Sequence, residues 1–212
     1  MRQDAHMNAG PRVAVVLCLT ASLAGMPSGP LAAGANRCTV IGGPDAEILQ
    51  GSDRDDVICG RGGDDVLIGL GGRDILRGGD GSDALRPGGG GGRVIGGDGR
   101  DLVSYADTAI AVAVDLRRGR ASGDGRDVLI DVENAVGSFV DDVLFGGPGP
   151  NLIRGYRGGD LIRGRGGDDK LVGAGNADRL YGGPGDDALN GGPGNDLCKQ
   201  GAGDGRIQNC EF

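Results

Sequence analysis

Residues 78–86 read GGDGSDALR, and residues 182–190, far along the chain, read GGPGDDALN. Both nonapeptides belong to one nine-residue frame, whose units begin at residues 42, 51, 60, 69, 78, 87 and 96, and then at 137, 146, 155, 164, 173, 182, 191 and 200. A short fixed period predicts stacked structural units, each packed against its neighbours. Without that period, 48 glycines and 9 prolines in 212 residues would indicate a low-complexity or disordered chain.

The eighth position of the frame, which we call column eight, is apolar in every unit. It comprises Leu49, Ile58, Leu67, Leu76, Leu85, Val94, Val103, Leu144, Ile153, Ile162, Leu171, Leu180, Leu189, Cys198 and Ile207. A narrow solenoid needs one inward-pointing apolar side chain on each short strand, so this column predicts the core. Glycine dominates columns one and four, and we expect both columns to need the positive φ angles of tight turns.

Column six carries the carboxylates, because eleven of its fifteen residues are aspartates. Aspartate also supports turns by bonding to its own backbone, but turn formation alone would accept Asn and Ser freely, and only Asn151 appears. Stacked carboxylates repel one another unless a cation lies between them, and calcium suits flexible, oxygen-rich loops. The column therefore predicts several calcium ions, with the ligands Asp56, Asp65, Asp74, Asp83, Asp101, Asp142, Asp160, Asp169, Asp178, Asp187 and Asp196.

These repeats resemble the RTX, or haemolysin-type, calcium-binding nonapeptide family, whose consensus is GGxGxDxUx. The resemblance covers residues 42–104 and 137–208. It implies an all-β fold, a right-handed parallel β-roll in which two repeats make one turn. It also implies that six-residue loops hold calcium, that the last three residues of each repeat form a strand, and that loops two repeats apart share an ion.

Carried onto this chain, the resemblance implies a set of carboxylate pairs two repeats apart. They are Asp56 with Asp74, Asp65 with Asp83, Asp83 with Asp101, Asp142 with Asp160, Asp160 with Asp178, Asp178 with Asp196, and Asp169 with Asp187. Gly92, Asn151 and Gly205 depart from the motif, and we expect weak or empty sites there. Replacing Gly92 by aspartate is expected to restore a carboxylate facing Asp74. Arg54 and Val140 replace the column-four glycine, which puts their loops in doubt.

The first 35 residues have the pattern of a secretory signal peptide. Arg2 and Arg12 precede an apolar run over residues 13–24, and residues 33–35 fit a cleavage site, with residues 31–33 as the alternative. A single membrane anchor is the competing interpretation, but the run is shorter than the roughly 20 residues of a spanning helix. We therefore expect a secreted, extracellular protein with no membrane span.

Cleavage after residue 35 would leave four cysteines, Cys38, Cys59, Cys198 and Cys210. An even number in an exported chain indicates two disulfides, for which three connectivities are possible. Cys38 lies two repeats before the repeat of Cys59, and the other two cysteines lie in the final turns. We therefore expect Cys38–Cys59 and Cys198–Cys210, each closing one end of the stack.

Residues 105–136 lie outside the frame. Residues 109–116 alternate like a strand, residues 119–125 read as a turn, and residues 128–136 are apolar again. We expect a first β-roll block at 36–104, a non-repeat β connector at 105–136, and a second block with a C-terminal cap at 137–212. Binding of a partner is the alternative role for the connector.

Composition excludes several functions. A formal net charge of −8 argues against nucleic-acid binding, which needs a cationic surface. His6, the only histidine, lies in the leader, so histidine-based triads and H-E-x-x-H metal chemistry are excluded. The chain also lacks G-x-S-x-G, P-loop and G-x-G-x-x-G motifs. We therefore predict no enzymatic activity.

The prediction that remains is a calcium-binding repeat protein that folds on calcium and acts as a structural or adhesive extracellular module. The alternative is a subunit or accessory scaffold that binds another secreted protein or a cell-surface partner. Arg77, Arg86, Arg154 and Arg163 share column nine, which suggests an exposed basic stripe. These arginines could instead only neutralise the neighbouring acidic loops.

Overall fold

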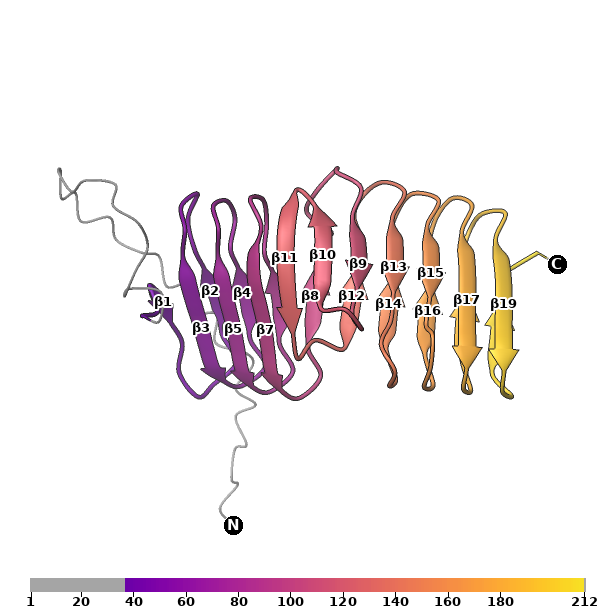
Figure 1. The fold of residues 1–212 in the computed structure, drawn as a ribbon, viewed down its shortest axis with the longest axis horizontal. Helices are drawn as coiled ribbons and strands as arrows, with labels where there is room; N and C mark the ends of the chain where they lie inside the picture. Colours follow the sequence, from indigo (N-terminus) through magenta and orange to yellow (C-terminus); the bar gives the residue numbers. More distant parts are fainter. Residues whose placement is uncertain (1–36, 212) are drawn as a thin grey trace, which may run out of the picture.

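Each nonapeptide contributes one strand, and successive strands alternate between two sheets that face each other across a narrow core (Figure 1). The computed structural model describes residues 37–211, so the expected signal peptide lies outside the described residues. Within that range no helix could cross a lipid bilayer.

One sheet has eleven strands and the other has nine. The eleven-stranded sheet runs β1 (Val40–Ile41), β3 (Val57–Gly62), β5 (Ile75–Asp80), β7 (Gly92–Asp98), β11 (Gly125–Ile130), β10 (Arg120–Gly123), β9 (Ala113–Asp115), β13 (Val143–Phe145), β15 (Leu161–Arg163), β17 (Arg179–Pro184) and β19 (Leu197–Ala202). The nine-stranded sheet runs β2 (Ile48–Gln50), β4 (Val66–Ile68), β6 (Ala84–Arg86), β8 (Leu102–Ser104), β12 (Asn134–Val136), β14 (Leu152–Arg154), β16 (Lys170–Val172), β18 (Ala188–Asn190) and β20 (Arg206–Gln208).

The strand register confirms the predicted parallel β-roll. Within the repeats, paired residues are two nonapeptides apart, as in Ile58 opposite Leu76 and Leu67 opposite Leu85. Column eight points inward, because its side chains from Leu49 to Leu180 are fully buried and Leu189 is almost so. Burying a leucine stabilises a fold by about 1.5–3 kcal/mol, so one such residue per strand builds a thin but continuous core.

Glycine serves two different purposes in the loops. Positive φ occurs at columns two and four, for example at Gly79 and Gly81, and not at column one. Our expectation was therefore wrong for column one. There the glycine is needed for space, because a Cβ on Gly60 would overlap the carboxylate of Asp65 and the carbonyl oxygen of Gly78. Column-one glycine thus lets a loop and its own carboxylate approach closely.

The interruption at residues 105–136 adds strands to both sheets. β11 pairs in parallel with β7, β9 pairs in parallel with β13, and β10 lies antiparallel between β11 and β9. β12 pairs in parallel with both β8 and β14 in the other sheet. The expected turn at residues 119–125 instead contains β10, because Ala121 packs inward between the outward-facing Arg120 and Ser122.

An ion pair also joins the interruption to the second block. Both guanidinium nitrogens of Arg165 donate to the carboxylate of Asp115, over 2.7 and 2.9 Å.

The expected basic stripe does not form, because Arg77 and Arg163 lie on the eleven-stranded sheet while Arg86 and Arg154 lie on the nine-stranded one. Consecutive repeats alternate between the sheets, so one column cannot form one stripe.

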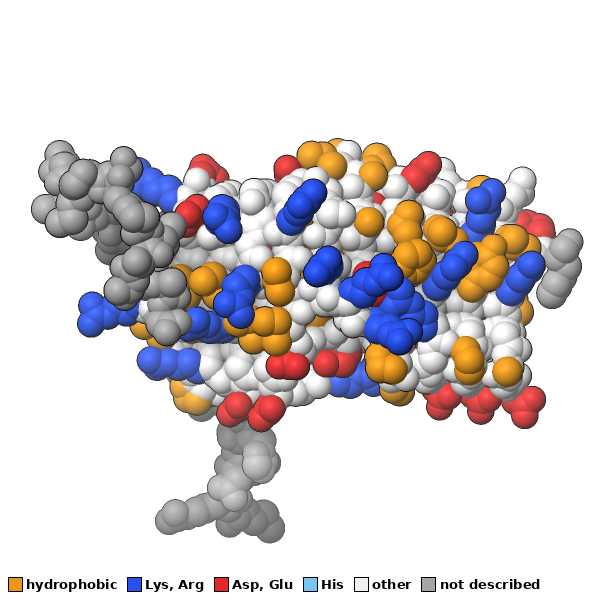
Figure 2. Space-filling view, viewed as in Figure 1, with side chains coloured by type: hydrophobic (Ala, Val, Ile, Leu, Met, Phe, Trp, Pro, Cys, Tyr) orange, Lys and Arg blue, Asp and Glu red, His pale blue; other side chains and the backbone are white. Residues whose placement is uncertain are grey.

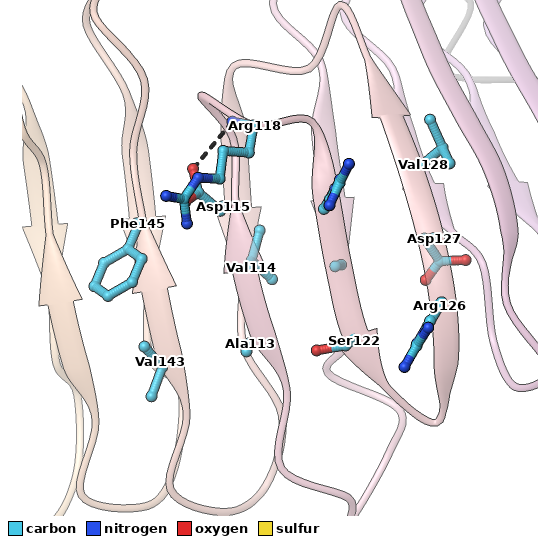
Figure 3. A pocket seen from close by; sticks show the side chains of 12 residues that line it. Ala113, Val114, Asp115, Arg118, Ser122, Arg126, Asp127, Val128, Val143 and Phe145 are labelled. Carbon is cyan, nitrogen blue, oxygen red and sulfur yellow. Dashed lines mark hydrogen bonds and ion pairs between the residues drawn. The ribbon is translucent and has the colours of Figure 1, made fainter.

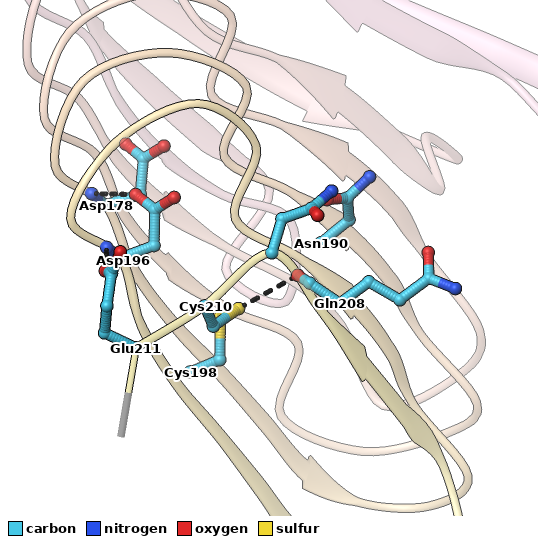
Figure 4. Close-up of a disulfide and its surroundings, with 8 residues drawn as sticks. Asp178, Asn190, Asp196, Cys198, Gln208, Cys210 and Glu211 are labelled. Atoms are coloured by element: carbon cyan, nitrogen blue, oxygen red, sulfur yellow. Dashed lines mark hydrogen bonds between the residues drawn. A yellow bond between two sulfur atoms is a disulfide. The ribbon is translucent and has the colours of Figure 1, made fainter.

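Disulfides close both ends of the roll with the expected pairing. Cys38 bonds to Cys59 at the first turns, and Cys198 bonds to Cys210 at the last (Figure 4). Terminal repeats lack a neighbour on one side, so a covalent link there opposes fraying.

Candidate metal centre

The column-six carboxylates stack into two ladders. One ladder lies in the loops that precede strands of the eleven-stranded sheet, and the other lies in the loops that precede strands of the nine-stranded sheet. The backbone amide of Asp65 donates to Oδ1 of Asp83 over 2.8 Å, and the residues are 18 positions apart. The same contact joins all seven pairs that the resemblance implied. Figure 4 shows the C-terminal end of one ladder, where Asp178, Asp196 and Glu211 lie one above another.

The second oxygen of most of these carboxylates has no hydrogen-bond partner in the described part of the chain. Oδ2 is buried and makes no hydrogen bond to any described residue in Asp65, Asp74, Asp83, Asp101, Asp160, Asp169, Asp178, Asp187 and Asp196. A buried charged oxygen without a partner loses its hydration and gains nothing in return. A row of such oxygens is the donor set that a hard cation binds.

Burial also makes the carboxyl groups of the ladders weaker acids. Burial raises the pKa of Asp160 to about 8 and that of Asp169 to about 7, and neighbouring carboxylates add to both shifts. Burial likewise raises the pKa of Asp65 and Asp178 to about 6. These carboxylates therefore hold their negative charge poorly without a cation beside them.

Two of the eleven predicted ligands lie in loops of a different kind. Ser52 donates from its amide and its hydroxyl to Oδ2 of Asp56, over 2.8 and 2.7 Å. Ser138 donates from its amide to Oδ2 of Asp142 and from its hydroxyl to Oδ1, and Oδ1 also accepts the Val112 amide. Neither loop has positive φ at columns two or four, whereas all nine loops with an unpartnered Oδ2 have it at column two. The structure therefore separates nine open carboxylates from two that their own loops satisfy.

The doubtful positions differ from one another. The amide of Gly147 donates to Asn151 Oδ1 over 2.6 Å, so this loop is of the satisfied kind. A Cβ on Gly92 would overlap the carbonyl oxygen of Asp74, and one on Gly205 would overlap that of Asp187. The expectation that an aspartate at position 92 restores a site is therefore wrong, because the backbone there already fills the space.

Three acidic residues that the repeat frame did not predict also lie in the ladders. Glu133 accepts the Asp101 amide over 2.9 Å, and Glu211 accepts the amide of Asp196. Asp127 lies opposite Gly92. A signal for Asp127 is present in the sequence, because Gly123–Asp127 repeats Gly97–Asp101 residue for residue, outside the nine-residue frame.

The donor set fits calcium only if the backbone takes part. No group of three or more acidic, cysteine or histidine side chains within residues 37–211 converges closely enough to hold a metal alone. Calcium takes six to eight oxygen ligands and readily accepts backbone carbonyls. At each open loop a backbone carbonyl oxygen of the neighbouring turn and the unpartnered Oδ2 both lie close to the column-one glycine, so the residues present fit the ion.

Comparison with known proteins agrees with this geometry. No curated protein matches the chain. The family model of the RTX calcium-binding nonapeptide repeat matches in four copies, at residues 41–76, 60–94, 136–171 and 164–198. The matches together cover more than half of the 212 residues. The chain, a calcium-binding repeat protein with a parallel β-roll fold, belongs to the RTX calcium-binding nonapeptide repeat family.

Proposed function

We propose that this protein is a secreted module that folds when it binds several calcium ions and then serves a structural or adhesive role outside the cell. The observation that carries the proposal is that nine buried Oδ2 atoms, distributed over the two ladders, have no hydrogen-bond partner among the described residues. Bound calcium would supply the positive charge between stacked loops. The two disulfides and the signal-like first 35 residues support an extracellular location.

The two carboxylate oxygens of each open aspartate and the column-one glycine of its loop have different roles in this proposal. Oδ1 of each open aspartate accepts the amide of the loop below and fixes the stacking distance. Oδ2 is left for the ion, and column-one glycine keeps the carboxylate close to its own loop. The thin core and the entropy of the glycine-rich loops give the metal-free chain little support, so binding free energy becomes folding free energy. We propose no catalytic role for these carboxylates.

A calcium titration followed by circular dichroism tests this function. The chain from residue 36 onward should gain β-structure as calcium rises through roughly 10⁻⁴ to 10⁻³ M, the range of extracellular modules, and should lose it on chelation. Magnesium at the same concentration is the control, because it demands a near-ideal octahedral site and should induce far less structure. Unchanged β-content after chelation would contradict the proposal.

A second candidate function is the binding of an anionic partner on the eleven-stranded sheet. Figure 2 shows Lys, Arg and hydrophobic side chains over this face, with acidic side chains along its upper and lower edges. Arg118, Arg120 and Arg126 line a pocket of about 570 Å³ together with Val128 and Phe145 (Figure 3). The Arg120 and Arg126 side chains make no hydrogen bond or ion pair with a described residue, which favours a partner over simple neutralisation.

Charge reversal separates the two functions. The double variant Arg120→Glu/Arg126→Glu should still fold with calcium but should lose retention on cell surfaces. Lys170→Glu/Arg206→Glu is the matched control, because these exposed side chains lie on the nine-stranded sheet. Equal retention of the wild type and both variants would remove the second candidate.

A further inference from the structure

Four side chains on the outer face of the eleven-stranded sheet alternate between aromatic and cationic. The strand register places Phe145 opposite Arg163, and it places Tyr181 between Arg163 and Lys199. All four point outward, since both cations are exposed and both rings are half-buried. We call these four residues the aromatic run, which follows the roll axis across β13, β15, β17 and β19.

A shorter run of the same kind lies in the first turns of the same sheet. Val128, which is 47% exposed, lies in register between Arg93 and Arg120, and we call these three residues the aliphatic run. Asp115 separates the two runs, but its carboxylate is paired with Arg165. Two hollows of about 570 and 630 Å³ lie beside this line and share Val128. The sheet thus offers one continuous path along the roll axis.

The four cations of the two runs are available to a ligand. Their side chains make no hydrogen bond or ion pair with a described residue, although the chain carries 30 acidic residues. The Arg163 guanidinium lies 5.7 Å from the centroid of the Phe145 ring and 5.3 Å from that of Tyr181. Such contacts restrain a guanidinium through its face and leave its N–H donors free. Arg163 is therefore a preorganised receptor for an anionic oxygen group.

The spacing of these charges favours a polysaccharide over other anionic chains. Neighbouring strands lie about 4.8 Å apart, so cations on every second strand are about 10 Å apart. An extended peptide presents side chains on one face about every 7 Å, and a nucleic-acid strand in a duplex carries a phosphate about every 3.4 Å. A sugar unit in an extended polysaccharide is about as long as the distance between two strands. A chain with one uronic acid in every two sugars therefore matches the cations, and the apolar face of a sugar ring packs well on an aromatic ring.

We propose that the aromatic run binds an acidic polysaccharide with one uronic acid in every two sugars, whose chain lies parallel to the roll axis. Arg163 and Lys199 pair with successive carboxylates, and the uncharged sugar between them packs on Tyr181. The aliphatic run offers the same arrangement around Val128 and extends the site. This inference rests on the second candidate function, the binding of an anionic partner, and it names the chemistry of that partner.

Binding of a hyaluronan octasaccharide tests the proposal, because this polymer has one carboxylate in every two sugars. The octasaccharide should bind the calcium-folded chain from residue 36 onward in isothermal titration, and added salt should weaken the binding. Poly-glutamate of equal charge and neutral dextran of similar length are the comparison ligands. Both should bind at least about tenfold more weakly. Vesicles that contain phosphatidylglycerol test a lipid surface in the same buffer and should not bind.

Single substitutions then locate the site. Arg163→Gln should weaken octasaccharide binding by about tenfold. Tyr181→Leu should also weaken it, although this change removes a ring and no charge. Arg154→Gln is the matched control, because Arg154 is an exposed column-nine arginine on the nine-stranded sheet, and it should leave the affinity unchanged. Circular dichroism in calcium checks that each variant folds.

Each contrary result has its own meaning. No octasaccharide binding by the calcium-folded chain would overturn the proposal. Equal or tighter binding of poly-glutamate or of the vesicles would also overturn it, and would leave the sheet with an anionic partner of another class. Equal affinities of Arg163→Gln and Arg154→Gln would place the site elsewhere. A chain that gains no β-structure with calcium would instead contradict the proposed folding function, and circular dichroism detects that before any ligand is added.

Discussion

The backbone amide of Asp160 donates a 2.8 Å hydrogen bond to Oδ1 of Asp178, while Oδ2 of both side chains is buried with no hydrogen-bond partner within residues 37–211. One carboxylate thus has two separable tasks. Its first oxygen sets the register between turns that are 18 residues apart, and its second oxygen is free for a cation. Substitutions that keep the first task and remove the second distinguish metal binding from stacking.

Asp160→Asn should weaken calcium binding with little change in the stacking geometry. Asparagine keeps a carbonyl oxygen for the amide of Asp142 but loses the negative charge. We expect the calcium midpoint of folding to rise about tenfold, which corresponds to ~1.4 kcal/mol. The measurement is a calcium titration followed by circular dichroism.

Asp142→Asn is the matched control for that variant. The carboxylate of Asp142 already accepts the amide and hydroxyl of Ser138 and the amide of Val112. An asparagine there turns an amide group toward a donor, and we expect a loss of about 1–3 kcal/mol in stability at saturating calcium. Its calcium midpoint should move less than that of Asp160→Asn, and equal shifts would contradict the division into open and satisfied loops.

The metal-free chain should be more structured at pH 5 than at pH 8. Burial raises the pKa of Asp160 from 3.8 to about 8 and that of Asp169 to about 7 in the fold. The folded chain therefore binds these protons more tightly than the unfolded chain. The contribution of these two protonated groups to the stability of the metal-free fold is fully present below about pH 4 and is lost as the pH rises toward 8. Circular dichroism at pH 5 and at pH 8, in the presence of a chelator, measures the difference in β-structure.

Calcium binding should have the opposite dependence on pH. Calcium and protons compete for the same carboxylate oxygens, so the calcium affinity should rise from pH 5 to pH 8 and binding should release protons. Titrations in two buffers of different ionisation enthalpy would detect that release. A calcium affinity that does not change between pH 5 and pH 8 would show that the carboxylates with a raised pKa are not calcium ligands.

Much of this structure was predictable from the repeat, because each column has one physical environment. Leu67 and Leu171 had to point inward, and Asp65 had to lie beside Asp83. The frame could not show that column-one glycine serves close approach, since close approach and positive φ both select glycine. It also missed Asp127, because the β10–β11 hairpin shifts the spacing and hides the repeat from a strict nine-residue count.

Removing the C-terminal disulfide should loosen one end of the roll only. Cys198 and Cys210 are 12 residues apart, and a closed loop of about 15 residues contributes about 3 kcal/mol. In Cys198→Ser/Cys210→Ser we expect faster amide hydrogen exchange in β19 and β20, with β4 and β5 unchanged. Cys38→Ser/Cys59→Ser should confine the change to β1 and β3. Faster exchange along the whole roll in either variant would show that the turns do not unfold independently.

The two uses of glycine can be separated by a pair of alanine substitutions. Gly164 is a column-one residue, and a Cβ there would overlap the carboxylate of Asp169 and crowd the carbonyl oxygen of Gly182. Gly175 also lacks a positive φ, but a Cβ there would meet nothing within 4 Å. We expect Gly164→Ala to lower stability by about 1–3 kcal/mol, the range for overpacking. We expect Gly175→Ala to be neutral or to stabilise by about 0.4–1 kcal/mol, since alanine restricts the unfolded chain.

Thermal unfolding at saturating calcium measures both changes, and a calcium titration adds a second readout. Because the alanine methyl group of Gly164→Ala displaces the Asp169 carboxylate, the calcium midpoint should rise in that variant. It should not move in Gly175→Ala. Equal destabilisation of the two variants would mean that glycine has the same role at column one as at the other loop positions. A loss confined to Gly164→Ala, accompanied by weaker calcium binding, would show that the missing side chain is what lets each carboxylate reach its ion.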